Sequence, residues 1–260
     1  VMLTYPKPGP IVTAMRAIFL ADAHLCKPSD PNYQAILAFL EEQCGKTDTL
    51  VLLGDIFEFW IGKASVVEAY VPVIDALERM HQQGTKLVYV EGNHDFHLGP
   101  VFTDRLACQV LPEGGSIELD GKRVFLAHGD LANPADKSYR RLRAFLRSGL
   151  IRTLLRLAPN SLTMAIATRG SYNSRKSAGE RRSRWPAREI LRPYAEAILA
   201  EGYQALVTGH YHHPFHEKLG DGEHIALGDW ITQFSYAVYE NHAFALKTYP
   251  VDTAPSNSVS

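Results

Sequence analysis

Short runs of apolar residues alternate with amphipathic stretches along the first half of the chain. Residues 15–21 and 49–53 have the length and composition of buried strands, and residues 32–44 between them repeat apolar side chains at helical spacing. Residues 66–83 carry a second helical pattern, and residues 86–90 form a third apolar run. Strands that alternate with helices in this way predict an α/β fold with parallel strands.

The second half of the chain returns to strand patterns. Asp120-Gly121 is a two-residue hairpin signal between the apolar stretches 116–119 and 123–127. Residues 203–207 form another apolar run. Three later patterns predict antiparallel strands of a second sheet, at residues 224–227, 231–239 and 243–249.

The stretch between the hairpin and the later strands differs in composition. Residues 138–159 predict one long amphipathic helix with a stripe of leucine and phenylalanine and with arginines around it, and a second basic helix is expected around residues 187–201. From Lys137 to Arg192, 15 Lys or Arg residues stand against two acidic ones, although the net charge of the whole chain is −1. This pattern suits a membrane surface or an acidic partner. The alternative is a helix that docks on the body by its leucine stripe and leaves its arginines in water.

Length and composition place the chain among ordinary globular proteins. At 260 residues, with 46% hydrophobic and 21% charged residues, it is long enough for one α/β domain over residues 1–260 with an insertion. Cys26, Cys44 and Cys108 form no CxxC pair, which favours a reducing cytoplasm. The first fifteen residues lack a signal-like pattern, and no run of eighteen apolar residues occurs, so neither a leader nor a membrane span is expected.

Oxygen and nitrogen ligands follow the apolar runs, where the strands are expected to end. The set contains two aspartates, one asparagine and four histidines: Asp22, His24, Asp55, Asn93, His128, His210 and His212. Carboxylate, amide and imidazole donors without thiolate suit Mn²⁺, Fe²⁺ or Zn²⁺. Seven donors exceed the need of one ion, and two ions about 3.5–4 Å apart share a bridging carboxylate, for which Asp55 is the central candidate. Such a pair of divalent ions predicts hydrolysis of a phosphoester or pyrophosphate.

Two residues beside Asn93 are predicted to be catalytic. His94 is not needed as a ligand and is expected to protonate the leaving group or to stabilise charge on the phosphoryl oxygens. Asp95 is expected to accept a hydrogen bond from that imidazole and so to fix its tautomer. In the segment just after Asp55, Phe57 is expected to pack under the site, whereas Trp60 is expected either to pack there or to line a substrate entrance.

Taken singly, each of these motifs is more often a turn or a surface accident, but five of them occur in order, each after a strand pattern. D-x-H, G-D, G-N-H-D, H-G-D and G-H-x-H lie between residues 18 and 213. They resemble the calcineurin-like metallophosphoesterase superfamily, which implies a four-layer αββα sandwich of two mixed sheets flanked by helices. The resemblance also implies two ligand groups that share one residue: Asp22, His24, Asp55 and His212 for one metal, and Asp55, Asn93, His128 and His210 for the other.

Longer segments resemble a narrower family, the UDP-2,3-diacylglucosamine hydrolases of lipid A biosynthesis. The segments are ADAHL, GDIFEFWIG, GNHDFHLG, GHYHHP and LGDW, which begin at Ala21, Gly54, Gly92, Gly209 and Leu227. Members of that family split the pyrophosphate of a UDP-linked diacyl sugar into the lipid monophosphate and UMP, typically with manganese. A helical cap inserted after the H-G-D motif holds the acyl chains in that family.

This second resemblance implies a basic helical cap at about residues 134–195. It also implies an anionic, lipid-linked nucleotide as substrate and a peripheral position on the inner face of the cytoplasmic membrane. Ser174, Arg175 and Lys176 are expected to contact the pyrophosphate or the uridine. Nucleic acid is not expected as a partner, because the arginine-rich segment lacks the interleaved aromatic residues of a stacking surface.

Two other functions remain open at this point. His94 stands where well-known members of the narrower family carry arginine, so an enzyme of the same superfamily acting on another phosphoester or lipid pyrophosphate is the alternative. A scaffold that kept the fold but lost catalysis is the third hypothesis. Such a scaffold is expected to lack ligands, and all seven are present.

Overall fold

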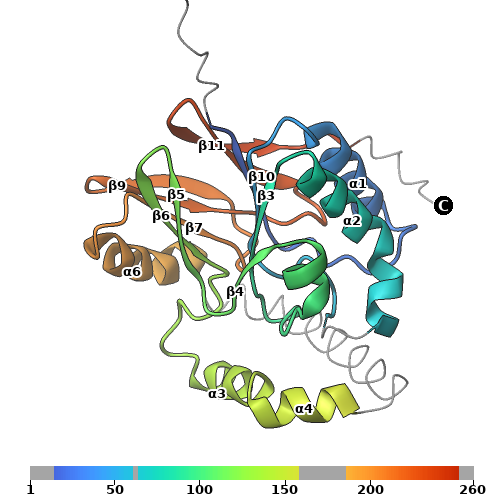
Figure 1. Ribbon diagram of the computed structural model, residues 1–260. Coiled ribbons are helices and arrows are strands. Elements are labelled where there is room, and N and C mark those ends of the chain that lie inside the picture. Colours follow the sequence, from blue (N-terminus) through green and yellow to red (C-terminus); the bar gives the residue numbers. More distant parts are fainter. Residues whose placement is uncertain (1–14, 61–63, 158–185, 252–260) are drawn as a thin grey trace, which may run out of the picture.

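Two β-sheets form the inside of the molecule, and the first has six strands. The computed structural model describes residues 15–60, 64–157 and 186–251 (Figure 1). Six strands pair in the order β11-β10-β1-β2-β3-β4, with β1 to β4 parallel and β10 and β11 antiparallel. Their bounds are β1 Ala17–Leu20, β2 Thr49–Leu52, β3 Lys86–Val90, β4 Gln109–Leu111, β10 Ser235–Glu240 and β11 Ala243–Thr248.

The second sheet has five strands in the order β5-β6-β7-β9-β8. Its three central strands, β6, β7 and β9, are parallel, and an antiparallel strand flanks them on each side. The bounds are β5 Gly115–Leu119, β6 Lys122–Ala127, β7 Ala205–Thr208, β8 Phe215–Leu219 and β9 Gly222–Ala226. Both sheets are therefore mixed, as the sequence predicted.

Helices cover the outer faces of the two sheets and complete four layers. Helices α1 (Pro31–Gln43) and α2 (Ala64–Gln82) lie on the first sheet, and α6 (Ala187–Ala200) lies on the second (Figure 1). Strand β1 shows why the central strands read as continuous apolar runs. Ile18 and Leu20 join the core under α1 and α2, while the alternate residues Ala17 and Phe19 join the core between the sheets.

The last strands differ from the prediction in their partners. The pattern at residues 224–227 does enter the second sheet, but as β9, parallel to β7. Strands β10 and β11 belong to the first sheet instead, where β10 pairs with β1. The prediction failed because side-chain alternation identifies a strand but carries no information on which edge accepts it. The sequence analysis also missed β4 and β8, which are short and partly exposed.

The long helix predicted at residues 138–159 is two helices within the described residues, α3 (Lys137–Leu146) and α4 (Gly149–Leu157). Asp136 caps the first helix, since its Oδ1 accepts a hydrogen bond from the backbone N–H of Tyr139 at 3.0 Å. The helix ends at Arg147, before Ser148 and Gly149, a pair of residues with low helix propensity. A short π-helical turn, η1 (Val101–Arg105), precedes β4.

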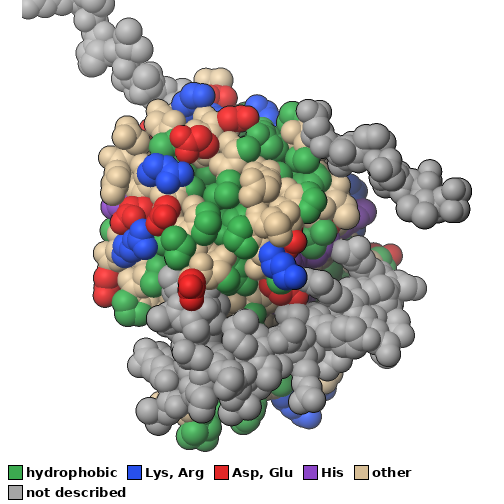
Figure 2. Space-filling model, turned by 90° about the vertical axis from the view of Figure 1, so that its right-hand side faces the viewer, with side chains coloured by type: hydrophobic (Ala, Val, Ile, Leu, Met, Phe, Trp, Pro, Cys, Tyr) green, Lys and Arg blue, Asp and Glu red, His purple; other side chains and the backbone are tan. Residues whose placement is uncertain are grey.

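Two arginines of this segment, Arg143 and Arg147, face the body, whereas four large apolar side chains of α3 and α4 face the solvent. Leu142, Phe145, Leu150 and Leu154 are 55%, 58%, 68% and 52% exposed. The side chains of Arg143 and Arg147 are only 9% exposed. The interpretation in which the leucine stripe docks on the body and the arginines stay in water is therefore wrong for these residues. Figure 2 shows apolar side chains along the lower margin, the level at which α3 and α4 lie in Figure 1.

Among the helices that the structure describes, none combines the length and the apolar character needed to cross a bilayer.

Candidate metal centre

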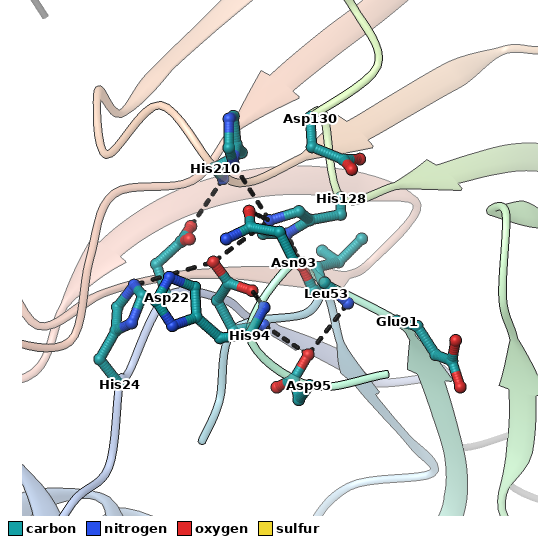
Figure 3. Close-up of polar contacts among 12 residues, drawn as sticks. Asp22, His24, Leu53, Glu91, Asn93, His94, Asp95, His128, Asp130 and His210 are labelled. Carbon is teal, nitrogen blue, oxygen red and sulfur yellow. Dashed lines mark hydrogen bonds and ion pairs between the residues drawn. The ribbon is translucent and has the colours of Figure 1, made fainter. Parts of the chain in front are cut away.

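The seven predicted ligands meet at one end of the two sheets. Asp22 and His24 follow β1, Asp55 follows β2, and Asn93 follows β3, all at the carboxyl ends of parallel strands in the first sheet. The parallel strands β6 and β7 of the second sheet deliver the three other histidines: His128, His210 and His212. Because the carboxyl ends of parallel strands lie along one edge, loops from both sheets converge there. Figure 3 shows five of these side chains pointing toward a common centre, namely Asp22, His24, Asn93, His128 and His210, and Figure 2 shows histidines at the right-hand edge of its view.

Asp22, His24 and His212 form one group whose ligand atoms all lie within 4.8 Å of one another. Nε2 of His212 is 3.4 Å from Oδ1 of Asp22. Nε2 of His24 lies 3.9 Å from Oδ2 of Asp55. Two donors bound to one ion at about 2.1 Å are separated by roughly 3–4 Å, so this group has the spacing of a metal site.

Asp55, His128 and His210 form a second group on the other side of the same carboxylate. Oδ2 of Asp55 is 3.5 Å from Nε2 of His128. That nitrogen is also 3.2 Å from Nδ1 of His210 and 3.2 Å from Oδ1 of Asn93. The same Asp55 oxygen thus approaches histidines of both groups, which is the geometry that a bridging carboxylate requires.

Hydrogen bonds to the outer ring nitrogens fix how two of the histidines face the centre. Nδ1 of His128 lies 2.7 Å from the carbonyl oxygen of Leu53. Because a carbonyl only accepts, Nδ1 carries the proton and Nε2 is left for a metal. At His212, Nδ1 is 3.4 Å from Oδ2 of Asp229, again leaving Nε2 toward the centre.

Glu58 contacts the imidazole rings of His24 and His94, a role that the sequence analysis missed. Its carboxylate lies 3.6 Å from Nδ1 of His24, and its carbonyl oxygen accepts a hydrogen bond from Nδ1 of His94 at 2.9 Å. The carbonyl contact places the proton of His94 on Nδ1 and leaves Nε2 for a substrate. A backbone acceptor carries no signal in the sequence, so this role of Glu58 could only be seen in the structure.

Asp229 was also missed as a functional residue, although it lies in the LGDW segment. It follows β9, which is parallel to β7, so the rule that located the ligands applies to it as well. Its oxygens accept hydrogen bonds from the backbone N–H groups of Ile231, Thr232 and Gln233 at 2.7–3.1 Å. These donors fix the carboxylate that orients His212.

Asp95 has a different role from the predicted one. Its oxygens accept hydrogen bonds from the backbone N–H of Asp55 at 2.9 Å, of Ile56 at 2.7 Å and of Gly92 at 2.9 Å, and from the hydroxyl of Tyr89 at 2.5 Å. Asp95 was expected to orient Nδ1 of His94, but that nitrogen donates to the backbone carbonyl oxygen of Glu58 instead. Asp95 therefore holds the Asp55 loop in place, a task that the pattern G-N-H-D does not reveal.

Five of the predicted ligands have a backbone conformation that L-residues rarely adopt. The φ angles of Asp22, His24, Asp55, His210 and His212 are 54°, 46°, 53°, 71° and 51°. Left-handed backbone at non-glycine residues costs about 1 kcal/mol or more each and clusters at functional sites. The strain is retained because the turn at each strand end must aim a side chain back toward the centre.

Two glycines let the loops approach one another. A β-carbon at Gly92 would overlap Oδ1 of Asp55 and would lie 2.5 Å from the backbone nitrogen of Asp55. Gly54 has a φ angle of +80°, and a β-carbon there would lie 2.7 Å from both the Cα of Gly92 and Nδ1 of His128. Glycine is needed at both positions because of this close approach.

The buried aspartates and histidines of the site strongly shift one another's pKa values. Burial opposes ionisation of Asp55, but the charges of His128 and His94 outweigh burial and hold the pKa of Asp55 well below its usual range. Burial also opposes protonation of His128, yet the Asp55 carboxylate raises the pKa of His128 to about 10. At His212 burial is likewise outweighed, here by Asp22 and Asp229, and the pKa is raised to about 10.

Asp22 and His210 have properties that suit ligands of a divalent ion. Oδ1 of Asp22 is buried, accepts no hydrogen bond within the described part of the chain, and faces Nε2 of His212. A buried carboxylate oxygen without a donor is stabilised by a cation. Burial and the neighbouring His128 lower the pKa of His210 to about 4, so this imidazole is neutral at pH 7 and ready to act as a ligand.

The remaining predictions have mixed outcomes. Phe57 and Trp60 are both fully buried, and the indole N–H of Trp60 donates to the carbonyl oxygen of Leu98 at 2.9 Å, so Trp60 packs under the site and does not line an entrance. Ser174, Arg175 and Lys176 lie outside the described residues.

A four-layer α/β fold that brings these oxygen and nitrogen donors to one point is the architecture of a metal-dependent phosphoester hydrolase. The chain belongs to the calcineurin-like phosphoesterase family, whose model matches residues 15–214. It is accordingly a metal-dependent hydrolase of phosphoesters that uses divalent ions.

Two relatives illustrate its closer similarities. The UDP-2,3-diacylglucosamine hydrolase of Aeromonas salmonicida is 33% identical over 229 residues, which cover 86% of this chain and 89% of that protein. The enzyme of the same name from Pseudomonas paraeruginosa is 34% identical over 227 residues, which cover 84% and 92%. A solved archaeal phosphodiesterase aligns with 90% of this chain and 99% of its own at 14% identity and a TM-score of 0.49, a likeness too distant to add to the assignment.

Proposed function

We propose that this protein hydrolyses the pyrophosphate of UDP-2,3-diacylglucosamine to the lipid monophosphate and UMP. The observation that carries the proposal is the exposed apolar face of α3 and α4, formed by Leu142, Phe145, Leu150 and Leu154, on helices whose opposite side contacts the loops of the metal centre through Arg143 and Arg147. A hydrolase of small soluble phosphoesters has no use for such a surface, whereas a lipid-linked substrate requires one. The names of the relatives support the same substrate.

In this proposal the seven ligands hold two divalent ions, with manganese expected. Asp22, His24 and His212 would hold one ion, Asn93, His128 and His210 would hold the other, and Asp55 would be shared between them. Two such ions lower the pKa of a bound water and neutralise phosphoryl oxygens during in-line attack.

His94 acts on the departing phosphate. Its backbone N–H donates to Oδ1 of Asp55 at 2.9 Å, so its position is tied to the bridging carboxylate. Because Nδ1 keeps its proton on the Glu58 carbonyl, the ring must be doubly protonated to act as the acid: it then gives the Nε2 proton to the leaving oxygen when the phosphorus–oxygen bond breaks and is left neutral. Water supplies the oxygen that the nucleotide phosphorus gains.

The proposal extends to the surroundings of the centre. One domain over residues 1–260 carries a cap at about residues 134–195, within which Ser174, Arg175 and Lys176 contact the pyrophosphate or uridine. The enzyme works in the cytoplasm as a peripheral protein on the inner face of the cytoplasmic membrane. The basic charge of the cap segment supports this location, because anionic lipid surfaces attract Lys and Arg.

Release of UMP tests the substrate. Purified protein loaded with Mn²⁺ is expected to release UMP from UDP-2,3-diacylglucosamine in detergent, and to hydrolyse p-nitrophenyl phosphate and bis(p-nitrophenyl) phosphate at least about a hundredfold less efficiently, because these lack most of the binding contacts. Chromatographic detection of UMP gives the rate. Turnover of the aryl substrates without any UMP release would reject this function in favour of another phosphoester.

The exposed face of α4 is expected to matter for lipid only. Replacing Leu150 and Leu154 together by serine removes two apolar side chains from the face, and each buried side chain of this size contributes about 1.5–3 kcal/mol to transfer from water. We expect binding to anionic liposomes to fall at least about tenfold by sedimentation, with hydrolysis of bis(p-nitrophenyl) phosphate unchanged. Val71→Ser, an exposed apolar position on α2, is the control. Equal liposome binding by all three proteins would contradict the prediction.

A further inference from the structure

Two arginines of α3 turn toward the body of the protein. Arg143 and Arg147 are four residues apart, so they lie on the same face of the helix, opposite to the exposed Leu142 and Phe145. Each guanidinium is largely removed from water, with only 9% of the side chain exposed. A buried guanidinium is costly unless its donors are matched by close acceptors, so the contacts of these two side chains define where the helix can sit.

Arg143 reaches the loop that follows β6. Its Nε donates to Oδ2 of Asp130 at 2.6 Å, and its Nη1 donates to Oε2 of Glu113 at 2.8 Å. The hydroxyl of Tyr139, one turn earlier in the helix, donates to the same oxygen of Asp130 at 2.6 Å. Asp130 lies two residues after His128, so this contact joins the helix to a ligand-bearing loop of the second sheet.

Arg147 reaches the loop that follows β3. Its Nη2 donates to the carbonyl oxygen of Gly92 at 2.7 Å, and its Nη1 donates to the carbonyl oxygen of Pro112 at 2.5 Å and to Oε2 of Glu91 at 3.1 Å. Gly92 directly precedes Asn93, so the second contact joins the helix to a ligand-bearing loop of the first sheet. In Figure 3 the side chain of Glu91 points away from the cluster of ligands, as does that of Asp130.

Glu91 and Asp130, the acidic partners of these arginines, bind the helix to the body. Glu91 and Asp130 are buried acids placed beside the metal centre but outside its ligand groups. Each acid is paired in its buried position with one of the two arginines: Asp130 with Arg143 at 2.6 Å and Glu91 with Arg147 at 3.1 Å.

We propose that Arg143 and Arg147 are positioning residues that lock α3, and with it the apolar face that α3 and α4 carry, onto the two loops that bear Asn93 and His128. The inference rests on the proposed function, since it assigns these residues to the handling of a lipid-linked substrate. The lock spans both sheets, so the lipid-binding face and the metal centre keep one relative geometry during turnover.

Arg147→Met tests the lock, because it removes the donors and keeps most of the length of the side chain. We expect KM for UDP-2,3-diacylglucosamine to rise about tenfold to a hundredfold, while kcat/KM for bis(p-nitrophenyl) phosphate stays within about twofold and bound Mn²⁺ is unchanged. Arg147→Lys keeps the positive charge, but one ammonium group cannot contact the several acceptors that the planar guanidinium reaches. We therefore expect a smaller rise in KM for UDP-2,3-diacylglucosamine, again with little change for bis(p-nitrophenyl) phosphate. Arg141→Met, an exposed arginine on the same helix, is the matched control.

Equal losses on both substrates would overturn the proposal, because Arg147 would then serve the whole fold or the metals. Unchanged kinetics on both would overturn it as well. Hydrogen–deuterium exchange separates this outcome from a failure of the proposed substrate: the amides of α3 should exchange at least about tenfold faster in Arg147→Met than in Arg141→Met, whatever the enzyme hydrolyses. Exchange rates equal to those of the control would refute the lock even if the wild-type protein releases no UMP.

Discussion

Replacing Asp55 by asparagine is expected to lower hydrolysis at least about a thousandfold, which is a loss of about 4 kcal/mol of transition-state stabilisation. The change keeps the shape of the side chain but removes its charge and one of its two acceptor oxygens. Oδ2 of Asp55 lies 3.5 Å from Nε2 of His128 and 3.9 Å from Nε2 of His24, so its loss affects both ligand groups at once. Elemental analysis should find at most one ion per chain in place of two.

The control is Asp104→Asn, which makes the same chemical change at an exposed position in η1. That variant should bind two ions and keep its activity. An Asp55→Asn protein with a full complement of metal and more than a tenth of the wild-type rate would show that the carboxylate is not shared between two ions.

Replacing Asp95 by asparagine is expected to destabilise the fold by about 3–5 kcal/mol and to weaken metal binding. Asp95 is fully buried and accepts from four backbone N–H groups, those of Asp55, Ile56, Phe57 and Gly92, and from the Tyr89 hydroxyl. An asparagine would place an NH₂ group against donors, since only one of its two terminal atoms accepts. The N–H groups of Asp55 and Gly92 would then lose the contact that holds them together.

Denaturant unfolding of the metal-free protein and titration with Mn²⁺ measure the two effects. Asp136→Asn is a suitable comparison, because asparagine caps helices about as well as aspartate and the cap of α3 should survive the change. A normal unfolding free energy together with a reduced kcat and a shifted pH profile would instead restore the catalytic role that the sequence suggested for Asp95.

The meeting of the candidate ligands at one place could be predicted from the sequence because two simple rules act together. Apolar runs mark buried strands, and parallel strands place their carboxyl ends along one edge of a sheet, so a residue such as Asp55 or His128 is located once its strand is recognised. The strand and helix patterns gave an α/β fold with a second sheet, whereas the four-layer arrangement of two mixed sheets followed from the family resemblance. Placing the ligands needed no knowledge of side-chain contacts, since the strand ends alone bring the loops together.

The features that escaped the sequence depend on partners distant in the chain. An arginine on an amphipathic helix reads as solvent-exposed, and only the positions of Asp130 and Glu91 show that Arg143 and Arg147 turn inward. The task of Asp95 depends on backbone donors 38 to 40 residues away. Hydrophobic periodicity indicates which residues are buried, but not which other residues they contact.

The hairpin of β10 and β11 completes the sheet that positions two of the candidate ligands. The last predicted ligand is His212, yet β1, which carries Asp22 and His24 at its end, pairs on one side with β10, more than 200 residues later in the chain. Until that hairpin has been synthesised, β1 has an open edge available to other chains. Folding with contacts at such long separation is slow. A chain cut just after His212 would therefore keep every candidate ligand, but the strand that carries Asp22 and His24 would lack its partner β10.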